Sequence, residues 1–299
     1  MTTRYLDFDF PAVKIGAATY EDDPTGCTVF VFPERVAAAV DVRGGDPGVS
    51  EYQYSHYDAI CFAGGSLRGL EAAHGVRAEL VAQHGPDRDL VSGAVVNDGY
   101  KRANGRYPDK ALGQLAYRRA EPNRFPLGAR GAGRNVWVGG RRGRGVGRPE
   151  QAGQGGAFGQ FGLVKVAAFT VLNAFGALHD RQGRVVRGNL VPESDRRTSD
   201  LDGLPAVLDG RAAPPPSQGN TTLTLVVTNQ ALTPGALRQV GRQVHAAMAR
   251  AIQPFHTIYD GDVLYTVTTN QVEDSPLDPV SLGLVAAEVV WDALLTSSD

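Results

Sequence analysis

From Thr221 to the C-terminus the sequence alternates two strand patterns with two helix patterns, and this order limits the fold more than any other feature. Residues 221–228 alternate aliphatic side chains with threonine, and residues 263–269 read VLYTVTT, so both segments are typical of strands. Apolar stripes with helical spacing begin at Thr233-Pro234 and at Asp278-Pro279, where a capping side chain precedes a proline. The order strand, helix, strand, helix predicts an α/β fold in which helices cover a sheet.

The N-terminal part of the chain continues the α/β pattern. Ser66 follows two glycines at the end of a strand and is predicted to cap the next helix. No internal repeat is visible, so we expect a single domain over residues 1–299. Strands are predicted at residues 28–32, 37–42, 57–63, 90–96 and 163–172, and helices after Ser66 and over residues 109–119.

One segment interrupts this regular order. Residues 191–219 are polar and rich in proline, and they end in Pro-Pro-Pro-Ser-Gln-Gly. Three consecutive prolines cannot join a helix interior or a central strand. We therefore expect an exposed, proline-rich linker between the two regular parts of the chain.

The charge balance limits the partners. Lys and Arg number 30 against 32 for Asp and Glu, which gives a formal charge of -2. Such a surface is not expected to bind nucleic acid or an anionic membrane. No stretch approaches the roughly 20 apolar residues of a membrane span, and the first residues show no secretory signal pattern. Cys27 and Cys61 lie in apolar, strand-like settings, which indicates free thiols in a reducing compartment, so we expect a cytoplasmic protein.

Other candidate chemistries are weaker. The histidines and cysteines show no zinc-site spacing, so no metal or cofactor is expected. Residues 139–148 form a basic, glycine-rich run that we interpret as a solvated loop. Ser66 lies at a predicted strand-to-helix turn, where α/β-hydrolases place a serine nucleophile. The glycine that this motif needs at position 68 is an arginine, so a Ser66 hydrolase stays an alternative.

The residues Gly219-Asn220-Thr221-Thr222 suggest a different nucleophile. They place a hydroxyl residue at the start of a buried strand, directly after the exposed segment. If the bond before Thr221 is cut, one residue carries both a hydroxyl and a primary amine. A free α-amine has a pKa near ~7.7 and can act as the base for its own hydroxyl at neutral pH.

Several motifs in a fixed order strengthen this interpretation. The most specific are Gly219-Asn-Thr-Thr-Leu223, Pro254-Phe-His-Thr257 and Asp260-Gly-Asp262, taken at these separations. From Tyr5 to the C-terminus the chain resembles the DmpA-type aminopeptidase family of self-processing N-terminal-nucleophile hydrolases. Further matching segments are residues 8–18, 24–26, 39–45, 63–65, 107–113, 131–133, 153–155, 186–189 and 290–294.

The resemblance implies a fold and a set of site residues. The fold would be a four-layer αββα sandwich, self-cleaved between Asn220 and Thr221 into residues 1–220 and 221–299. Thr221 would be the catalytic nucleophile. Asp260 and Asp262 match the positions that hold the amine and hydroxyl of the nucleophile, and Asn173 matches the family's oxyanion-binding asparagine.

The resemblance also implies a reaction. It indicates a hydrolase of linear amide bonds that acts on 6-aminohexanoate (nylon) oligomers or related short peptides, needs no cofactor, and assembles as a homotetramer of cleaved protomers. An aminopeptidase acting on short, β- or D-peptides, and an inactive relative that serves as a binding or structural protein, remain alternatives. The residues leave endo and exo action open.

Two positions depart from the family pattern. Gly140 and Arg141 stand where the family has a lysine near the nucleophile, and Asn97 stands where it has an oxyanion tyrosine. A guanidinium is larger than an ammonium and does not deprotonate, so arginine is not a conservative replacement. Tyr100 is close to Asn97 in sequence. These changes bear on rate, self-cleavage and substrate choice.

Overall fold

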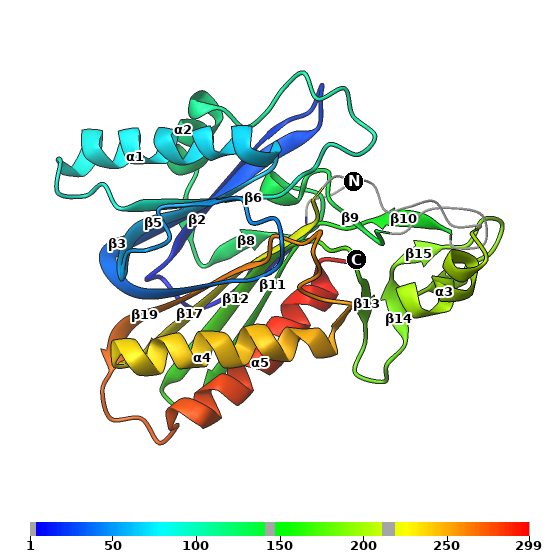
Figure 1. Cartoon of the computed structure of the whole chain (residues 1–299). Helices are drawn as coiled ribbons and strands as arrows, with labels where there is room; N and C mark the ends of the chain where they lie inside the picture. The colour runs from blue at the N-terminus through cyan, green and yellow to red at the C-terminus, as the bar shows by residue number, and fades with distance from the viewer. Residues whose placement is uncertain (1–3, 141–146, 211–218, 299) are drawn as a thin grey trace.

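The structure is a computed structural model that describes residues 4–140, 147–210 and 219–298. It has four layers, with two helices, two facing sheets and two further helices stacked in that order (Figure 1). The four-layer αββα arrangement predicted from the resemblance is confirmed. The two halves of the chain interleave in the sheets, because strands from both halves pair with one another.

The first sheet carries the strands around Thr221. Its pairing order is β11, β12, β17, β19 and then the second half of β3, and the β17–β19 pair is parallel. A parallel pair needs a crossover connection, which α4 supplies, as the strand–helix–strand order predicts. The bounds are β11 Gln154–Phe161, β12 Val164–Asn173, β17 Thr221–Gln230, β19 Val263–Val272 and β3 Thr25–Val42.

Strand β3 joins the two sheets. The sequence predicted two short strands here, but one long strand forms, with an irregularity in its pairing with β5 between Val31 and Val36. Residues before this irregularity pair with β2 and β5. Residues after it pair with β19, and Val36 and Ala37 still pair with β5. The second sheet is completed by β2 Lys14–Tyr20, β5 His56–Ala63, β6 Val91–Val95 and β4 Val49–Ser50.

Four long helices form the outer layers. Thr233 and Asp278 cap α4 and α5 with their side chains, and each is followed by a proline at the first helical position, as predicted. By length and composition α5 could cross a membrane, but half of it is buried and it packs on β11, β12 and α4, as a core helix does. The bounds are α1 Glu71–His84, α2 Lys110–Arg118, α4 Pro234–Ala247 and α5 Pro279–Thr296.

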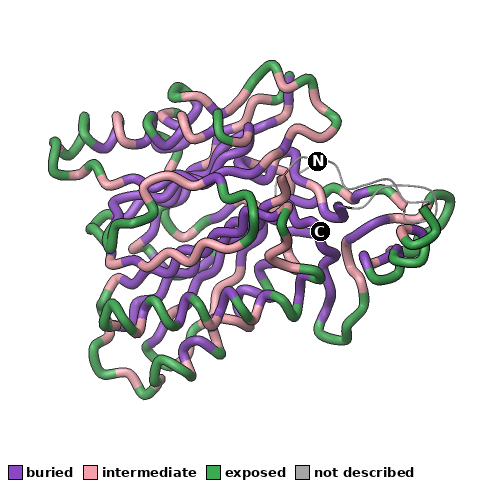
Figure 2. Tube along the Cα trace, viewed as in Figure 1, coloured by how far each residue is buried: buried purple, intermediate pink, exposed green. Residues whose placement is uncertain are grey.

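The main core lies between the two sheets (Figure 2). Aromatic rings cross this interface: Phe30 of β3 lies 5.3 Å from Phe169 of β12, and Phe62 of β5 lies 5.9 Å from Tyr265 of β19, measured between ring centroids. Because both faces of β17 are covered, all ten of its residues are buried, including its threonines. This packing fixes the strand that begins at Thr221.

A small projection extends from the sandwich (Figure 1). It contains helix α3, Asp200–Leu208, within the segment predicted to be an exposed linker. A capping box between Ser199 and Asp202 starts this helix, and Leu201 and Leu208 on it are 77% and 79% exposed. The segment is therefore exposed but partly helical. Short strands nearby are β9 Trp137–Val138, β10 Arg148–Gln151, β13 Ala177–His179, β14 Val185–Arg187, β15 Asn189–Leu190 and β16 Arg197–Thr198.

Short elements complete the fold. The prediction that Ser66 caps a helix is wrong: Gly65 is the N-cap of a 3-10 turn, without a side-chain capping bond. Ser66 itself has a φ of 56°, in the left-handed region. The remaining elements are β1 Tyr5–Asp7, β7 Glu121–Pro122, β8 Arg124–Pro126, β18 Ile252–Gln253, η1 Ser66–Leu70, η2 Gly131–Gly133 and η3 Met248–Arg250.

Candidate active site

Thr221 is the first residue of β17 and is buried rather than at the surface. It is 4% exposed, and its neighbour across the antiparallel β12–β17 pair is Asn173. The Thr221 hydroxyl donates a hydrogen bond of 2.5 Å to the carbonyl oxygen of Asn220. The candidate nucleophile is therefore beside the carbonyl group that self-cleavage requires it to attack.

The peptide group before Thr221 is held by the loop at residues 259–261. The Asn220 N–H donates to the carbonyl oxygen of Tyr259 at 2.6 Å, and the Gly261 N–H donates to the carbonyl oxygen of Asn220 at 2.8 Å. The Asn220 side chain also donates to the carbonyl oxygen of Asn173 at 3.2 Å. A carbonyl with a fixed N–H donor is polarised, and the same donor can stabilise an oxyanion.

Asp260 belongs to this loop and is 1% exposed. Its carboxylate accepts hydrogen bonds from the N–H and hydroxyl of Thr257, at 2.8 and 2.6 Å, and from the N–H of Phe175 at 3.2 Å. Burial raises the pKa of Asp260 to about 6, and the negative charge of Asp262 adds to this effect. Asp260 is thus poised to change charge close to neutral pH.

Asp262 is fully buried two residues further on. One carboxylate oxygen accepts a hydrogen bond of 2.7 Å from the N–H of Thr222, and the other lies 2.8 Å from Nδ1 of His256. Burial raises the pKa of Asp262, although the hydrogen bond to His256 opposes that shift. The structure thus brings Asp262 to the backbone beside Thr221. In the described part of the uncut chain, neither aspartate is hydrogen-bonded to the Thr221 hydroxyl.

Two histidines behind Asp262 were not selected from the sequence. His256 and His245 have ring centroids 4.5 Å apart, and Nδ1 of His245 lies 2.9 Å from Asp41. Burial lowers the pKa of His245 to about 4, so it is neutral at pH 7. The motif Pro254-Phe-His-Thr257 was the available signal for His256. Only the folded chain shows that its imidazole orients the Asp262 carboxylate.

Asn173 is also fixed by hydrogen bonds. Its Oδ1 accepts from the N–H of Trp137 at 3.1 Å, and its Nδ2 donates to the carbonyl oxygen of Asn97 at 3.2 Å. Asn173 is paired with Thr221 across the two strands, and one of its two amide hydrogens is donated to the carbonyl oxygen of Asn97. Tyr100 stacks edge-on against the Trp137 ring, with centroids 4.9 Å apart.

Gly140 stands at the position where the resemblance predicts a lysine. A Cβ at Gly140 would lie 2.0 Å from the ring of Phe175, so a larger residue there would require that ring to move. Arg141, the neighbouring candidate for that position, lies outside the described residues, as does most of the basic run up to Gly147. Asn97 borders the cavity beside Thr221.

Thr221 lines a cavity of about 270 Å³ together with residues of both halves of the chain. Ser66 lines the same cavity, but within the described residues no histidine does, and Ser66 has no side-chain base bonded to it. A serine nucleophile needs an adjacent base. The geometry therefore favours Thr221 over Ser66. The described lining consists of Asp46, Pro47, Gly48, Ser66, Leu67, Val95, Asn97, Gly219 and Thr221.

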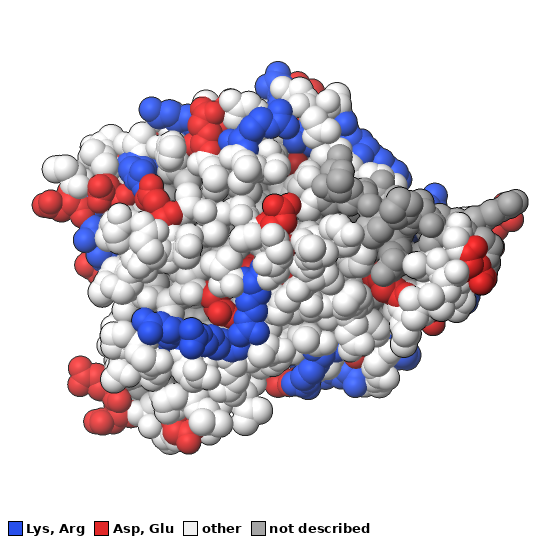
Figure 3. Space-filling view, viewed as in Figure 1, with Lys and Arg blue, Asp and Glu red and all other residues white. Residues whose placement is uncertain are grey.

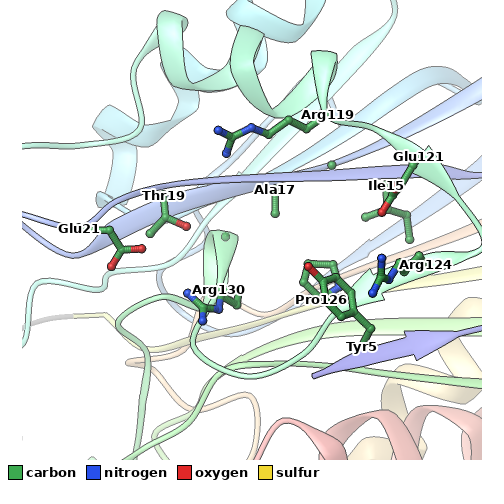
Figure 4. Close-up of a pocket in the computed structure, with 12 residues that line it drawn as sticks. Tyr5, Ile15, Ala17, Thr19, Glu21, Arg119, Glu121, Arg124, Pro126 and Arg130 are labelled. Atoms are coloured by element: carbon green, nitrogen blue, oxygen red, sulfur yellow. The ribbon is translucent and has the colours of Figure 1, made fainter. Parts of the chain in front are cut away.

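A larger cavity of about 440 Å³ lies elsewhere and does not include Thr221. Figure 4 shows Arg119, Arg124 and Arg130 around it, with Glu21 at one side. Neither Thr221 nor Ser66 is in its described lining, so volume alone does not identify the reaction site. On the face drawn in Figure 3, acidic and basic side chains are interspersed with uncharged areas. Among the described residues, no group of three or more His, Cys, Asp or Glu could hold a metal ion.

Comparisons with known proteins agree on one family. The model of peptidase family S58 matches residues 8–297. A 6-aminohexanoate-oligomer endohydrolase from Agromyces sp. (strain KY5R) is 42% identical, over 97% of this chain and 85% of its own length. An enzyme of the same name from Paenarthrobacter ureafaciens gives the same identity and coverage.

Solved structures show the same fold at low identity. A Burkholderia sp. beta-aminopeptidase has a TM-score of 0.70 with 16% identity, covering 99% of this chain and 87% of that one. The L-aminopeptidase D-Ala-esterase/amidase from Ochrobactrum anthropi, described as a variant of the Ntn hydrolase fold, has a TM-score of 0.69 with 17% identity, covering 96% and 83%.

Proposed function

The chain belongs to peptidase family S58 and is a hydrolase of amide bonds, and we propose that Thr221 is its self-generated N-terminal nucleophile. The observation that carries this proposal is the position of the Asn220–Thr221 peptide group. The hydroxyl of Thr221 lies against the Asn220 carbonyl, whose oxygen also accepts a hydrogen bond from Gly261. This arrangement supports the proposal, because a hydroxyl and an N–H donor both lie at the carbonyl group that would be attacked.

The proposed self-cleavage has two steps. The Thr221 oxygen bonds to the Asn220 carbonyl carbon, and the C–N bond breaks as the hydroxyl proton passes to the leaving nitrogen. The Gly261 N–H stabilises the oxyanion in this step. Water then hydrolyses the resulting ester, which frees the hydroxyl and leaves a carboxylate on Asn220. The products are residues 1–220 and residues 221–299.

In the proposed turnover the new α-amine is the general base. It takes the proton of the Thr221 hydroxyl as that oxygen attacks the substrate amide, and it later donates a proton to the leaving amine. Asp260 and Asp262 hold the amine and hydroxyl, and Asn173 supplies an amide donor to the oxyanion. Support comes from the Asn220–Asp260 bridge, the Thr222–Asp262 hydrogen bond and the Asn173–Thr221 pairing.

We propose oligoamides of 6-aminohexanoate as substrates, because two relatives at 42% identity are named for that activity. The cavity supports an aliphatic substrate, since Pro47, Leu67 and Val95 line it. Short peptides are the second candidate. The names of both solved neighbours and the peptidase family motivate them.

The location and assembly are proposed as well. Cys27 and Cys61 are buried free thiols, in keeping with a cytoplasmic enzyme. The exposed leucines of α3 are of the kind that mark protein contacts, in keeping with a homo-oligomer, for which we propose a tetramer of cleaved protomers.

The test is hydrolysis of 6-aminohexanoate oligomers, measured by the number of new amino groups that appear. Wild type should release them, and Asp262→Asn should lose roughly 10²–10⁴-fold in rate, because a positioned acid–base partner is removed. Ser66→Ala should still cut itself into two polypeptides. An uncut, inactive wild type would favour the binding-protein alternative, and an uncut wild type whose activity is lost in Ser66→Ala would favour the serine hydrolase.

A further inference from the structure

Among the described residues that line the cavity beside Thr221, one is charged, and it is acidic. That residue is Asp46, while the rest of the described lining is apolar, glycine or uncharged polar. The buried Asp260 and Asp262 belong to the loop on which Asp46 packs, since the N–H of Asp46 donates to the carbonyl oxygen of Asp260. A pocket lined by one sign of charge attracts a ligand group of the opposite sign. The cavity therefore suits a substrate end that carries a positive charge.

The position of Asp46 is fixed relative to the nucleophile. Its N–H donates to the carbonyl oxygen of Asp260 at 3.0 Å, and the N–H of Gly45 donates to that of Thr257 at 3.1 Å. A Cβ on Gly261 would lie 2.2 Å from the Asp46 carbonyl oxygen, so the two loops are in direct backbone contact. The loop that carries Asp46 is thus packed on the loop that holds the Asn220 carbonyl.

The Asp46 carboxylate is available to a ligand. In the described ranges 4–140, 147–210 and 219–298, no hydrogen bond or ion pair engages it. Arg43 in the same loop is bound to Asp41 at 2.7 Å, and Arg77 is paired with Glu51. These guanidinium groups are therefore already neutralised by other carboxylates.

The uncut chain shows which part of a substrate Asp46 would meet. In self-cleavage the acyl side of the bond is the chain leading up to Asn220, so Gly219 marks the path of a substrate's acyl group. Oδ2 of Asp46 lies 2.5 Å from where a Cβ on Gly219 would stand. The Cα of Gly219 is four bonds from the Asn220 carbonyl carbon, whereas the nitrogen of a 6-aminohexanoyl group is six bonds from its own carbonyl carbon. The amine of an α-aminoacyl group is only two bonds away.

We propose that Asp46 binds the terminal ammonium of the substrate's acyl group, so that the enzyme preferentially releases ω-aminoacyl units from the free amino end of an oligoamide. This proposal rests on the proposed function, because it assigns a substrate group to the same cavity. Pro47, Leu67 and Val95 contact the aliphatic chain between the ammonium and the carbonyl carbon. Asp46 is a binding residue and does not touch the reacting atoms.

The experiment compares two anilides that differ only in the amine, 6-aminohexanoyl-p-nitroanilide and hexanoyl-p-nitroanilide. Wild type should favour the first in kcat/KM by roughly twofold to fivefold, as for an ion pair with an exposed carboxylate. Asp46→Asn should lower kcat/KM for the amine substrate alone and remove the preference. Asp7→Asn is the control, because Asp7 is 81% exposed in its side chain and lies outside the cavity.

The outcomes separate the two proposals. Hydrolysis of neither anilide by the wild type would overturn the proposed function and the Asp46 site with it. Hydrolysis of both without preference, or a preference that survives in Asp46→Asn, would overturn only the Asp46 site. If Asp46→Asn does not fold, the wild-type preference still decides, since it should shrink as salt rises from 0.01 to ~1 M. A preference independent of salt would contradict the ion pair.

Discussion

Asp260 shows how a single buried side chain couples the site to pH. Its carboxyl has a pKa of about 6 in the folded chain, raised from 3.8 chiefly by burial. Between these values the folded state binds a proton that the unfolded state has released. The stabilisation from the neutral carboxyl is therefore fully present below pH 3.8 and is lost as the pH rises through about 6.

The first prediction is that the free energy of unfolding falls as the pH rises, because of Asp260. Thr221→Ala, which should stay uncut, is compared with the same chain carrying Asp260→Asn. The free energy of unfolding of Thr221→Ala should fall relative to the double variant by about 2–3 kcal/mol between low and neutral pH, since one pKa unit is ~1.4 kcal/mol. Denaturant unfolding at several pH values measures it. A difference that does not change with pH, or that grows as pH rises, would contradict the raised pKa.

At the scale of elements, the contact between α5 and β11 determines the outer layer beside the first sheet. Gly155 of β11 lies under α5, where an added Cβ would be 1.9 Å from the carbonyl oxygen of Ala293 and 2.7 Å from the N–H nitrogen of Ser297. The helix can approach this closely only because the strand has no side chain there. Gly235 in α4 is the opposite case, with nothing within 4 Å of an added Cβ.

The second prediction uses these two glycines as a matched pair. Gly155→Ala should lower the free energy of unfolding by about 1–3 kcal/mol, because α5 must move off the strand. Gly235→Ala should be neutral or stabilising by up to ~1 kcal/mol, because alanine favours an exposed helix. Thermal or denaturant unfolding of both variants tests this. Equal effects of the two substitutions would show that α5 does not depend on the close approach.

Regular elements could be predicted where periodicity and end signals agree. Helices α4 and α5 and strands β17 and β19 have both, and all four form. Strand β11 was missed because its sequence, QGGAFGQF, has little strand propensity and depends on α5 packing against its glycines. Helix α3 was missed because prolines and polar residues surround its capping box, although Ser199 and Asp202 have the required spacing.

The site could be predicted only in part for a related reason. Thr221 belongs to a motif of neighbouring residues, so the sequence alone drew attention to it, and its role remains a prediction. Gly261 meets the Asn220 carbonyl through its backbone N–H, and Asp46 reaches the site because its loop packs on the loop of Gly261. No local pattern reports such a contact.

At the scale of the whole molecule, the proposed cut separates two interleaved parts. Strand β17 lies between β12 and β19, and β19 pairs with β3, so residues 221–299 contribute strands inside the sheet formed mostly by the rest. Their apolar residues share one core. The two polypeptides should therefore stay together after the cut.

The third prediction follows from this interleaving. Under native conditions both polypeptides should elute as one species, with a mass four times that of one chain if the proposed tetramer forms. Light scattering after gel filtration gives that mass, and a denaturing gel of the peak shows both polypeptides. Separation of the two without denaturant would contradict the shared core. A single-chain mass would contradict the tetramer alone.

The measurement that tests the central claim most directly is the intact mass of the denatured wild type and of Thr221→Ala. If Thr221 cuts the bond before itself, the wild type gives two polypeptides, residues 1–220 and residues 221–299. Thr221→Ala then gives one chain of 299 residues. A wild type that hydrolyses amides as a single chain, or a Thr221→Ala variant that yields the same two polypeptides, would contradict Thr221 as a self-generated N-terminal nucleophile.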